Sequence, residues 1–271
     1  MIYFPNAKIN LGLRVLGRRE DGFHNLQSAF VPVGLSDVLE VKVIENGTHG
    51  RLNFSILGHK IKGENLDNLV VKAHDLLSAE YDFPELTATL LKNIPSGAGL
   101  GGGSSDGSFM LKAINNICHL GLSRKSLEQY AAKLGSDCPF FIKNEPSIVT
   151  GRGEELSKFN CPNQFVDKYI LIIFPGVGVS TAEAFALLDS KDSEKIDFND
   201  SSTIVNDFQN GVKNRVPEVA EAIKFHEENG ADFVQMTGTG SSVFGLYSNA
   251  NTQLKTEAEE RGWRAYLGAF L

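Results

Sequence analysis

Cysteine is scarce in this chain of 271 residues, which contains only Cys118, Cys138 and Cys161, with no C-x-x-C pair among them. Disulfide frameworks and zinc sites both need clustered cysteines, so this wide spacing speaks against either one. We therefore expect three reduced thiols and a cytoplasmic protein.

Long apolar runs and an excess of positive charge are also missing. No stretch approaches the roughly 20 apolar residues of a membrane span, and the first residues resemble neither a signal peptide nor a transit peptide. The formal net charge is -7, so the chain lacks the basic footprint of a nucleic-acid or membrane-surface binder. The hydrophobic content of 42% supports a substantial core. We expect a small-molecule partner, no nucleic acid and no membrane.

Glycine, by contrast, is concentrated in one place: five of the eleven residues from Pro95 to Ser105 are glycine. Because glycine loses the most backbone entropy on folding, such a run indicates a backbone that curls around an anion. A predicted strand at 86–90 precedes it, and an apolar helical pattern at 109–118 follows. Ser104 and Ser105 then predict a helix N-cap, where phosphate binding is favoured. A flexible linker is the alternative, against which the short length and close flanks argue.

Two familiar phosphate motifs fail on this loop. Residues 97–102 match G-x-G-x-x-G, but no acidic residue follows about 20 residues on, as a dinucleotide site requires. A Walker loop needs Gly-Lys-Ser/Thr, whereas Ser104 follows Gly103. The sequence therefore predicts a phosphate-binding loop of a third type.

The remaining patterns predict an α+β protein. In the first half we expect strands at 8–15 and 37–44, a turn at 45–47 and a helix at 68–77. A capping box at Ser126–Gln129 predicts a further helix that stops at Gly135.

The second half has a regular order of elements. We expect strands at 168–174, 233–236, 243–247 and 263–267, with helices from a cap at Ser180, at 217–228 and at 252–261. This β-α-β-β-α-β order is that of the ferredoxin-like split unit. Residues 237–242 form a second loop of Gly, Ser and Thr, which a hairpin turn alone would explain. Its length favours close approach of a ligand.

Three segments in this order resemble the GHMP small-molecule kinases, the group of galactokinase, homoserine kinase and mevalonate kinase. They are residues 6–12, 94–106 and 236–242. Residues 21–24 (Asp-Gly-Phe-His) and 135–141 (Gly-Ser-Asp-Cys-Pro-Phe-Phe) are similar to segments of the branch whose substrate carries a cytidine diphosphate group.

The resemblance implies a two-domain fold. Residues 1–157 would resemble the second domain of ribosomal protein S5 and carry the ATP loop, and residues 158–271 would be ferredoxin-like, with the active site between them. It also implies an ATP-dependent kinase that phosphorylates an alcohol in isoprenoid precursor biosynthesis, with Mg²⁺ bridging phosphate oxygens. The metal ligands and the oligomeric state stay open.

Two other functions are compatible with parts of the pattern. The chain could be another GHMP kinase, of the homoserine or mevalonate type, but an amino-acid or sugar site has no use for the base-stacking segment at 21–24. It could also be a catalytically silent nucleotide-binding module, although such a module would be expected to have lost Lys8 or Asp137, and both are present.

The resemblance assigns roles to particular residues. Asp137 would be the catalytic base, and Lys8 beside it would keep it ionised and stabilise developing charge. Without this context the two would be an exposed loop carboxylate and a solvated charge at a strand start. The ATP phosphates would be bound by Pro95, Ser96, Gly97, Ala98, Gly99, Leu100, Gly101, Gly102, Gly103, Ser104 and Ser105. Lys92 is a further candidate for contacting the nucleotide.

For the substrate, the resemblance implies that Phe23 and Phe185 enclose the cytosine and His24 reads it. Asn10 and Thr181 would contact the rest of the molecule. The family often has tyrosine where this chain has Phe23. Phenylalanine keeps the aromatic face for stacking and lacks only the tyrosine hydroxyl. Phe185 as a core aromatic on a helix, and His24 as a structural histidine, are the alternatives.

Overall fold

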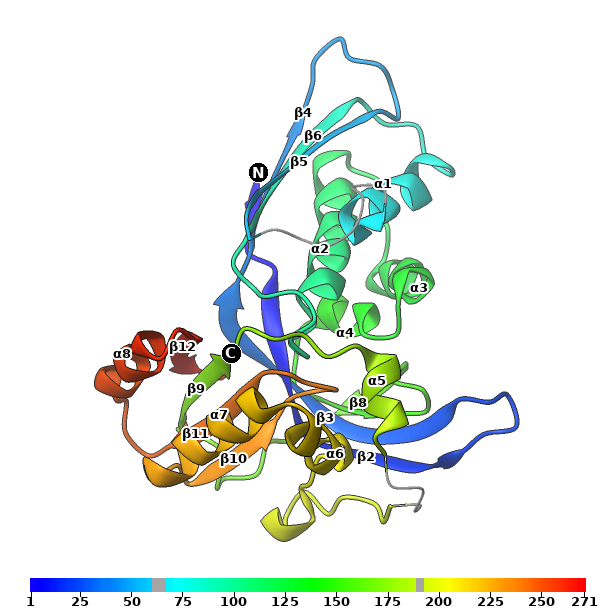
Figure 1. The fold of residues 1–271 in the computed structure, drawn as a ribbon. Coiled ribbons are helices and arrows are strands. Elements are labelled where there is room, and N and C mark those ends of the chain that lie inside the picture. The colour runs from blue at the N-terminus through cyan, green and yellow to red at the C-terminus, as the bar shows by residue number, and fades with distance from the viewer. Residues whose placement is uncertain (60–66, 189–192) are drawn as a thin grey trace. The chain divides into compact units, whose positions relative to one another are not determined.

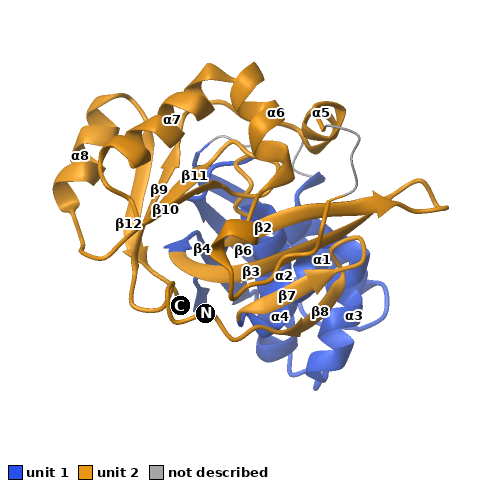
Figure 2. Ribbon diagram, turned by 90° about the horizontal axis from the view of Figure 1, so that it is seen from below, with its two compact units in different colours: residues 1–7, 35–96, 101–145 blue, residues 8–34, 97–100, 146–271 orange. Residues whose placement is uncertain are grey.

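The computed structural model describes residues 1–59, 67–188 and 193–271. The chain forms two compact units that alternate along the sequence, coloured separately in Figure 2. Unit 1 comprises residues 1–7, 35–96 and 101–145, and unit 2 comprises residues 8–34, 97–100 and 146–271. Compact units need not follow domain borders, so the division at residue 157 stays a prediction.

Unit 1 is built on a four-stranded sheet in the order β1 (Ile2–Tyr3), β4 (Val38–Val43), β6 (Leu86–Lys92) and β5 (Leu52–Gly58). Strands β5 and β6 are parallel, joined through helix α1 (Leu69–Ser78), and the other pairs are antiparallel. Helices α1, α2 (Gly102–Ile117) and α3 (Arg124–Leu134) gather on one side of this sheet (Figure 1). Their apolar faces form one buried cluster with the inward-facing strand residues. The predicted strands at 37–44 and 86–90 and the helix at 68–77 are confirmed.

Two predicted helix starts in unit 1 are wrong. Helix α2 begins at Gly102, before the serines at 104 and 105 that were expected to cap it. The left-handed backbone of Gly101 (φ 71°) ends the loop one residue earlier. Ser104 and Ser105 therefore lie inside its first turn. Helix α3 begins at Arg124, and Ser123 caps it by accepting a hydrogen bond from the Ser126 amide at 3.1 Å. The predicted stop at Gly135 is confirmed.

Unit 2 contains two sheets. One has the order β2 (Asn6–Arg18), β3 (His24–Ser36), β7 (Ser147–Thr150) and β8 (Glu155–Lys158). The other is antiparallel, in the order β10 (Phe233–Met236), β11 (Val243–Tyr247), β9 (Tyr169–Phe174) and β12 (Arg264–Ala269). Its connecting helices are α5 (Thr181–Ala186), α6 (Asp207–Arg215), α7 (Pro217–Glu228) and α8 (Thr252–Glu260), with a short 3₁₀ turn, η2 (Ser201–Thr203).

The second sheet confirms the ferredoxin-like order. Strand β11 lies between β9 and β10, so the two strands joined by α5, α6 and α7 are parallel to each other but not adjacent. Helices α7 and α8 bury apolar residues such as Val219, Phe225 and Leu254 against this sheet. Each such burial stabilises the fold by about 1.5–3 kcal/mol. Across the described residues, every helix is too short or too polar to span a bilayer.

Candidate active site

The glycine loop adopts a backbone suited to anion binding. Gly97, Gly99 and Gly101 all have left-handed φ angles, of 67°, 74° and 71°. They alternate with Ala98 and Leu100, which are not among the residues of positive φ. Such alternation turns successive N–H groups toward one concave side, the geometry that binds phosphate. Ser96, Gly97 and Gly103 are exposed, so parts of this segment are open to a ligand.

Within unit 2 the second loop of small residues packs directly on the first. A side chain at Gly99 would lie 2.1 Å from the Thr237 carbonyl oxygen, and one at Gly238 would lie 3.0 Å from the Gly99 Cα atom. The Ser242 amide also donates to the Ala98 carbonyl at 3.2 Å. The small residues at 237–242 therefore permit a close backbone approach. Whether a ligand also approaches them stays a prediction.

Lys8 and Asn10 lie next to this loop contact. The Lys8 side chain is 3% exposed, and its Nζ donates to Asn10 Oδ1 at 2.5 Å and to the Gly99 carbonyl at 3.4 Å. It also lies 4.4 Å from the centre of the Phe30 ring. The backbone N–H of Asn10 donates to the Thr237 hydroxyl at 2.9 Å. Unit 2 thus places a buried ammonium group beside the loop predicted to bind ATP.

Asp137 stands in unit 1 at the start of the short helix α4 (Cys138–Lys143) and is half-buried. Ser108 joins this segment to helix α2, because its hydroxyl contacts the Ser104 and Cys138 carbonyls at 2.8 Å each. Unit 1 therefore connects the start of α2 to the residue next to the predicted catalytic base. Burial raises the pKa of the Cys138 thiol to about 11, and all three cysteines are free.

Lys92 is buried in unit 1 rather than open to a nucleotide. It is 2% exposed and pairs with the carboxylates of Asp37 and Asp106, the latter at 2.7 Å. The two carboxylates outweigh the effect of burial and raise the pKa of Lys92. Sequence reasoning missed both aspartates as its partners. Asp106 stands four residues before Met110 on the buried face of α2, a signal that could have revealed a buried ion pair.

The predicted substrate residues form two separate stacks in unit 2. His24 stacks on Phe185, with ring centroids 5.1 Å apart and an interplanar angle of 28°. Phe23 is 50% exposed, and the Arg152 guanidinium lies 3.6 Å from its ring centre. Phe185 also packs on Phe208 in the core, so it has the contacts of a core aromatic. Thr181 is exposed at the start of α5, after the predicted cap at Ser180, which forms a capping box with Glu183.

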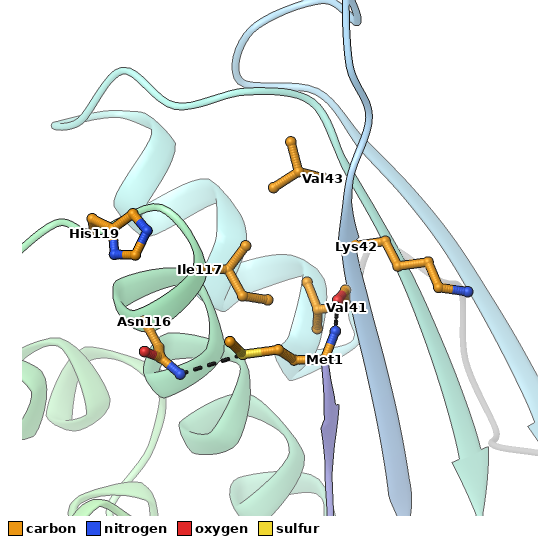
Figure 3. A pocket seen from close by; sticks show the side chains of 7 residues that line it. All are labelled: Met1, Val41, Lys42, Val43, Asn116, Ile117 and His119. Atoms are coloured by element: carbon orange, nitrogen blue, oxygen red, sulfur yellow. Dashed lines mark hydrogen bonds between the residues drawn. The ribbon is translucent and has the colours of Figure 1, made fainter.

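One pocket of unit 1 contains none of these residues. It is lined by residues of the N-terminus, β4 and the end of α2, drawn in Figure 3: Met1, Val41, Lys42, Val43, Asn116, Ile117 and His119. Among these residues, the Met1 ammonium donates to the Val41 carbonyl at 2.7 Å. With no predicted site residue in its wall, this pocket is not the candidate active site.

Comparison with known proteins first shows the class of protein to which the chain is similar. The model of the GHMP kinases N terminal domain matches residues 68–145, and that of the GHMP kinases C terminal domain matches residues 182–262. The solved structure of the mevalonate kinase of Methanococcus jannaschii has a TM-score of 0.72 at 15% identity, covering 100% of this chain and 98% of that one. That likeness establishes the fold alone.

Two further similarities are more specific. The 4-diphosphocytidyl-2-C-methyl-D-erythritol kinase of Bacteroides thetaiotaomicron is 43% identical over 95% of this chain and 96% of its own length. A crystal structure of 4-(cytidine 5'-diphospho)-2C-methyl-D-erythritol kinase has a TM-score of 0.83 at 29% identity, covering 100% of this chain and 99% of that one. The chain therefore belongs to the GHMP kinases and, within them, to the family of 4-diphosphocytidyl-2-C-methyl-D-erythritol kinases.

Proposed function

We propose that this protein transfers the terminal phosphoryl group of ATP to the 2-hydroxyl of 4-diphosphocytidyl-2-C-methyl-D-erythritol, a step of isoprenoid precursor biosynthesis by the non-mevalonate route. The observation that carries the proposal is the loop with left-handed glycines at 97, 99 and 101, against which Lys8 places its ammonium group. Such a loop offers N–H donors to a triphosphate, and a buried cation beside it can stabilise charge as the phosphoryl group moves.

Asp137 is the general base in this proposal, and it takes the proton of the attacking hydroxyl. Lys8 stabilises the charge that develops on the transferred group. Phosphoryl transfer asks a protein mainly for positioning and charge stabilisation, so the two side chains do not form a covalent intermediate. The pairing of Lys8 with Asp137 is itself part of the proposal.

Mg²⁺ bound with the nucleotide would neutralise phosphate charge during the transfer. Among the described residues, no group of three or more His, Cys, Asp and Glu side chains is placed to hold a metal ion. That fits a cation bound mainly through the nucleotide. The Ser105 hydroxyl, buried in the first turn of α2 and without a hydrogen-bond partner among the described residues, is the oxygen that we assign to it.

Phe23, His24, Phe185, Asn10 and Thr181 are the residues proposed to bind the substrate. Phe23 offers an exposed aromatic face on which a base could stack, and His24 with Phe185 offers a second planar pair. The cytosine would be recognised by these rings. We also place the protein in the cytoplasm, whose reducing conditions suit its free thiols.

A substrate panel tests the proposal. ADP release is measured with 4-diphosphocytidyl-2-C-methyl-D-erythritol, homoserine and mevalonate, each with ATP and Mg²⁺. We expect strong turnover of the diphosphocytidyl compound alone. Turnover of homoserine or mevalonate in its place would indicate another GHMP kinase. Nucleotide binding without turnover of any of the three would indicate a silent module.

A further inference from the structure

The two ends of the glycine loop are attached to one buried ionic cluster in unit 1, formed by Asp37, Lys92 and Asp106. The three residues are 0%, 2% and 1% exposed. Lys92 Nζ lies between the carboxylates and contacts an oxygen of each. Asp37 precedes β4, Lys92 ends β6 and Asp106 lies in α2, so the cluster joins three elements that are distant in sequence.

The N-terminal end of the loop is held by Asp37. Its Oδ1 accepts hydrogen bonds from the amides of Asn93 at 2.6 Å and Ile94 at 2.8 Å. These are the last residues before Pro95. The Asn93 side chain adds a hydrogen bond to the Ser36 carbonyl at 3.0 Å. The chain therefore enters the loop from a fixed backbone position.

The C-terminal end of the loop is held by Asp106. Asp106 lies in the first turns of α2, five residues after Gly101, and accepts a hydrogen bond from Lys92 Nζ at 2.7 Å. The first turn of α2 also packs tightly here. A side chain at Gly102 would lie 2.8 Å from Ile94 Cγ2 and 3.4 Å from Lys92 Nζ. The start of the helix is thus fixed to the strand end from which the loop departs.

A glycine-rich loop gains from such fixed ends. Its flexible backbone must lose entropy when it binds a phosphate, and that cost falls if the flanking segments are already in place. Burying a charge cluster also costs desolvation free energy, and apolar residues of similar volume would fill the core as well. Its attachment on both sides of the loop suggests a role beyond stability.

We propose that Asp37, Lys92 and Asp106 are positioning residues for ATP, which hold both ends of the glycine loop so that its N–H groups are arranged before the nucleotide binds. The inference rests on the proposed function, in which this loop binds the phosphates. It adds three residues that act through the loop rather than by contact with ATP.

The test compares Asp106→Ala with the isosteric Asp106→Asn, which keeps an oxygen for Lys92 Nζ. Affinity for a non-hydrolysable ATP analogue is measured by calorimetry, and KM is measured separately for ATP and for the diphosphocytidyl substrate. For Asp106→Ala we expect the analogue affinity to fall and KM for ATP to rise about tenfold, with KM for the other substrate within about twofold. Asp106→Asn should stay within about threefold of wild type for ATP.

Tyr130→Phe is the matched control for general destabilisation of unit 1. This change in α3 removes the hydroxyl that donates to Glu80 Oε2 at 2.5 Å, away from the loop. We expect its KM for ATP to equal that of wild type. An equal rise of KM for ATP in Tyr130→Phe, or of both KM values in Asp106→Ala, would overturn the proposal.

A second variant keeps the test decisive if Asp106→Ala does not fold. The combined change Asp37→Asn, Lys92→Met and Asp106→Leu removes all three charges and keeps an oxygen at position 37 for the Asn93 and Ile94 amides, and proteins often tolerate the replacement of buried ionic groups by apolar ones. We expect a folded protein with the same weakened analogue binding. Wild-type affinity in this folded variant would overturn the proposal. If wild type fails to phosphorylate the diphosphocytidyl compound, the proposed function fails, whereas the analogue affinities still report on the cluster.

Discussion

Two buried lysines, one in each unit, differ in the groups that they contact within their own unit. Lys92 in unit 1 lies between the carboxylates of Asp37 and Asp106. Lys8 in unit 2 contacts, within its own unit, the Asn10 amide oxygen, the Gly99 carbonyl and the face of Phe30. Both are almost completely buried, at 2% and 3% exposure. The two lysines differ in what their contacts join: Lys92 connects two distant carboxylates of unit 1, whereas Lys8 contacts the backbone of the loop predicted to bind ATP.

The comparison shows that burial alone does not identify a catalytic lysine. An ammonium between two carboxylates has its charge already compensated, and its hydrogen bonds tie the chain together. An ammonium that contacts a carbonyl of a predicted phosphate-binding loop is placed to stabilise charge on a phosphate bound there. We therefore assign Lys92 to the architecture of the loop and Lys8 to the chemistry.

Among the predicted effects, the largest should be a loss of folding stability when the Lys92 charge is removed. Lys92→Met leaves Asp37 and Asp106 buried beside each other without their cation, which we expect to cost about 3–5 kcal/mol of unfolding free energy. Urea denaturation of wild type and variant measures it. A loss below 1 kcal/mol would mean that the carboxylates find other compensation, and the contrast between the lysines would weaken.

Removing the Lys8 charge should instead affect turnover. In Lys8→Met the stabilisation of the transferred phosphoryl group is lost, so we expect kcat to fall about 100- to 1000-fold. Circular dichroism and urea denaturation, as controls, should show a folded protein that retains most of its stability. A variant that unfolds like Lys92→Met while its folded fraction stays active would reverse the assignment of the two lysines.

His226 in unit 2 extends the comparison to a buried basic group that is neutral. It is 0% exposed, and its Nδ1 lies 2.9 Å from the Tyr247 hydroxyl. Burial lowers its pKa from 6.5 to about 4. Between these values the unfolded chain binds the proton and the folded one does not. The contribution of neutral His226 to the free energy of unfolding is therefore complete above pH 6.5 and is lost as the pH falls toward 4.

Urea denaturation at pH 7 and pH 4 of wild type and His226→Gln measures this effect. We expect wild type to lose about 3 kcal/mol more than the variant over that interval, because one unit of pKa shift corresponds to about 1.4 kcal/mol. Equal losses would indicate that His226 is protonated inside the fold, with a compensating partner like that of Lys92.

Arg152 is a basic side chain whose contact lies at an exposed site, and its removal should have the smallest of the predicted effects. Its guanidinium covers one face of Phe23, a contact worth about 0.5–1 kcal/mol at an exposed site. If that contact orients the ring for cytosine, Arg152→Ala should raise KM for the diphosphocytidyl substrate about two- to fivefold. KM for ATP should not change. A change confined to KM for ATP would contradict the role of Phe23.

Elements with strong periodicity could be predicted from the sequence. Strands β10 and β11 and helix α7 have the predicted bounds, because short apolar runs mark the strands and apolar residues repeat at helical spacing in α7. Helix α6 escaped prediction, since its nine residues bury only Phe208 and Val212 and its composition is otherwise polar. The start of α2 was misplaced because Gly101, which has no side-chain signal of capping, ends the loop.

The residues of the proposed site could be assigned from the sequence where one motif holds them, and less so where contacts are long-range. The glycine loop was found from composition, and Lys8 and Asp137 from the resemblance. Asp37 was missed because it lies 55 residues before Lys92, with no local pattern that joins them. Similarly, the packing of Thr237 on Gly99 spans 138 residues, so only the structure reveals why both loops contain small residues.

Turnover and nucleotide affinity of Asp137→Asn, measured side by side, test the proposed chemistry most directly. Asparagine preserves shape but cannot accept the proton of the substrate hydroxyl, so kcat should fall at least about 100-fold. Affinity for a non-hydrolysable ATP analogue should stay within about twofold of wild type, because the glycine loop is unchanged. Undiminished kcat in this variant would contradict the account, since Asp137 would then have no part in the reaction.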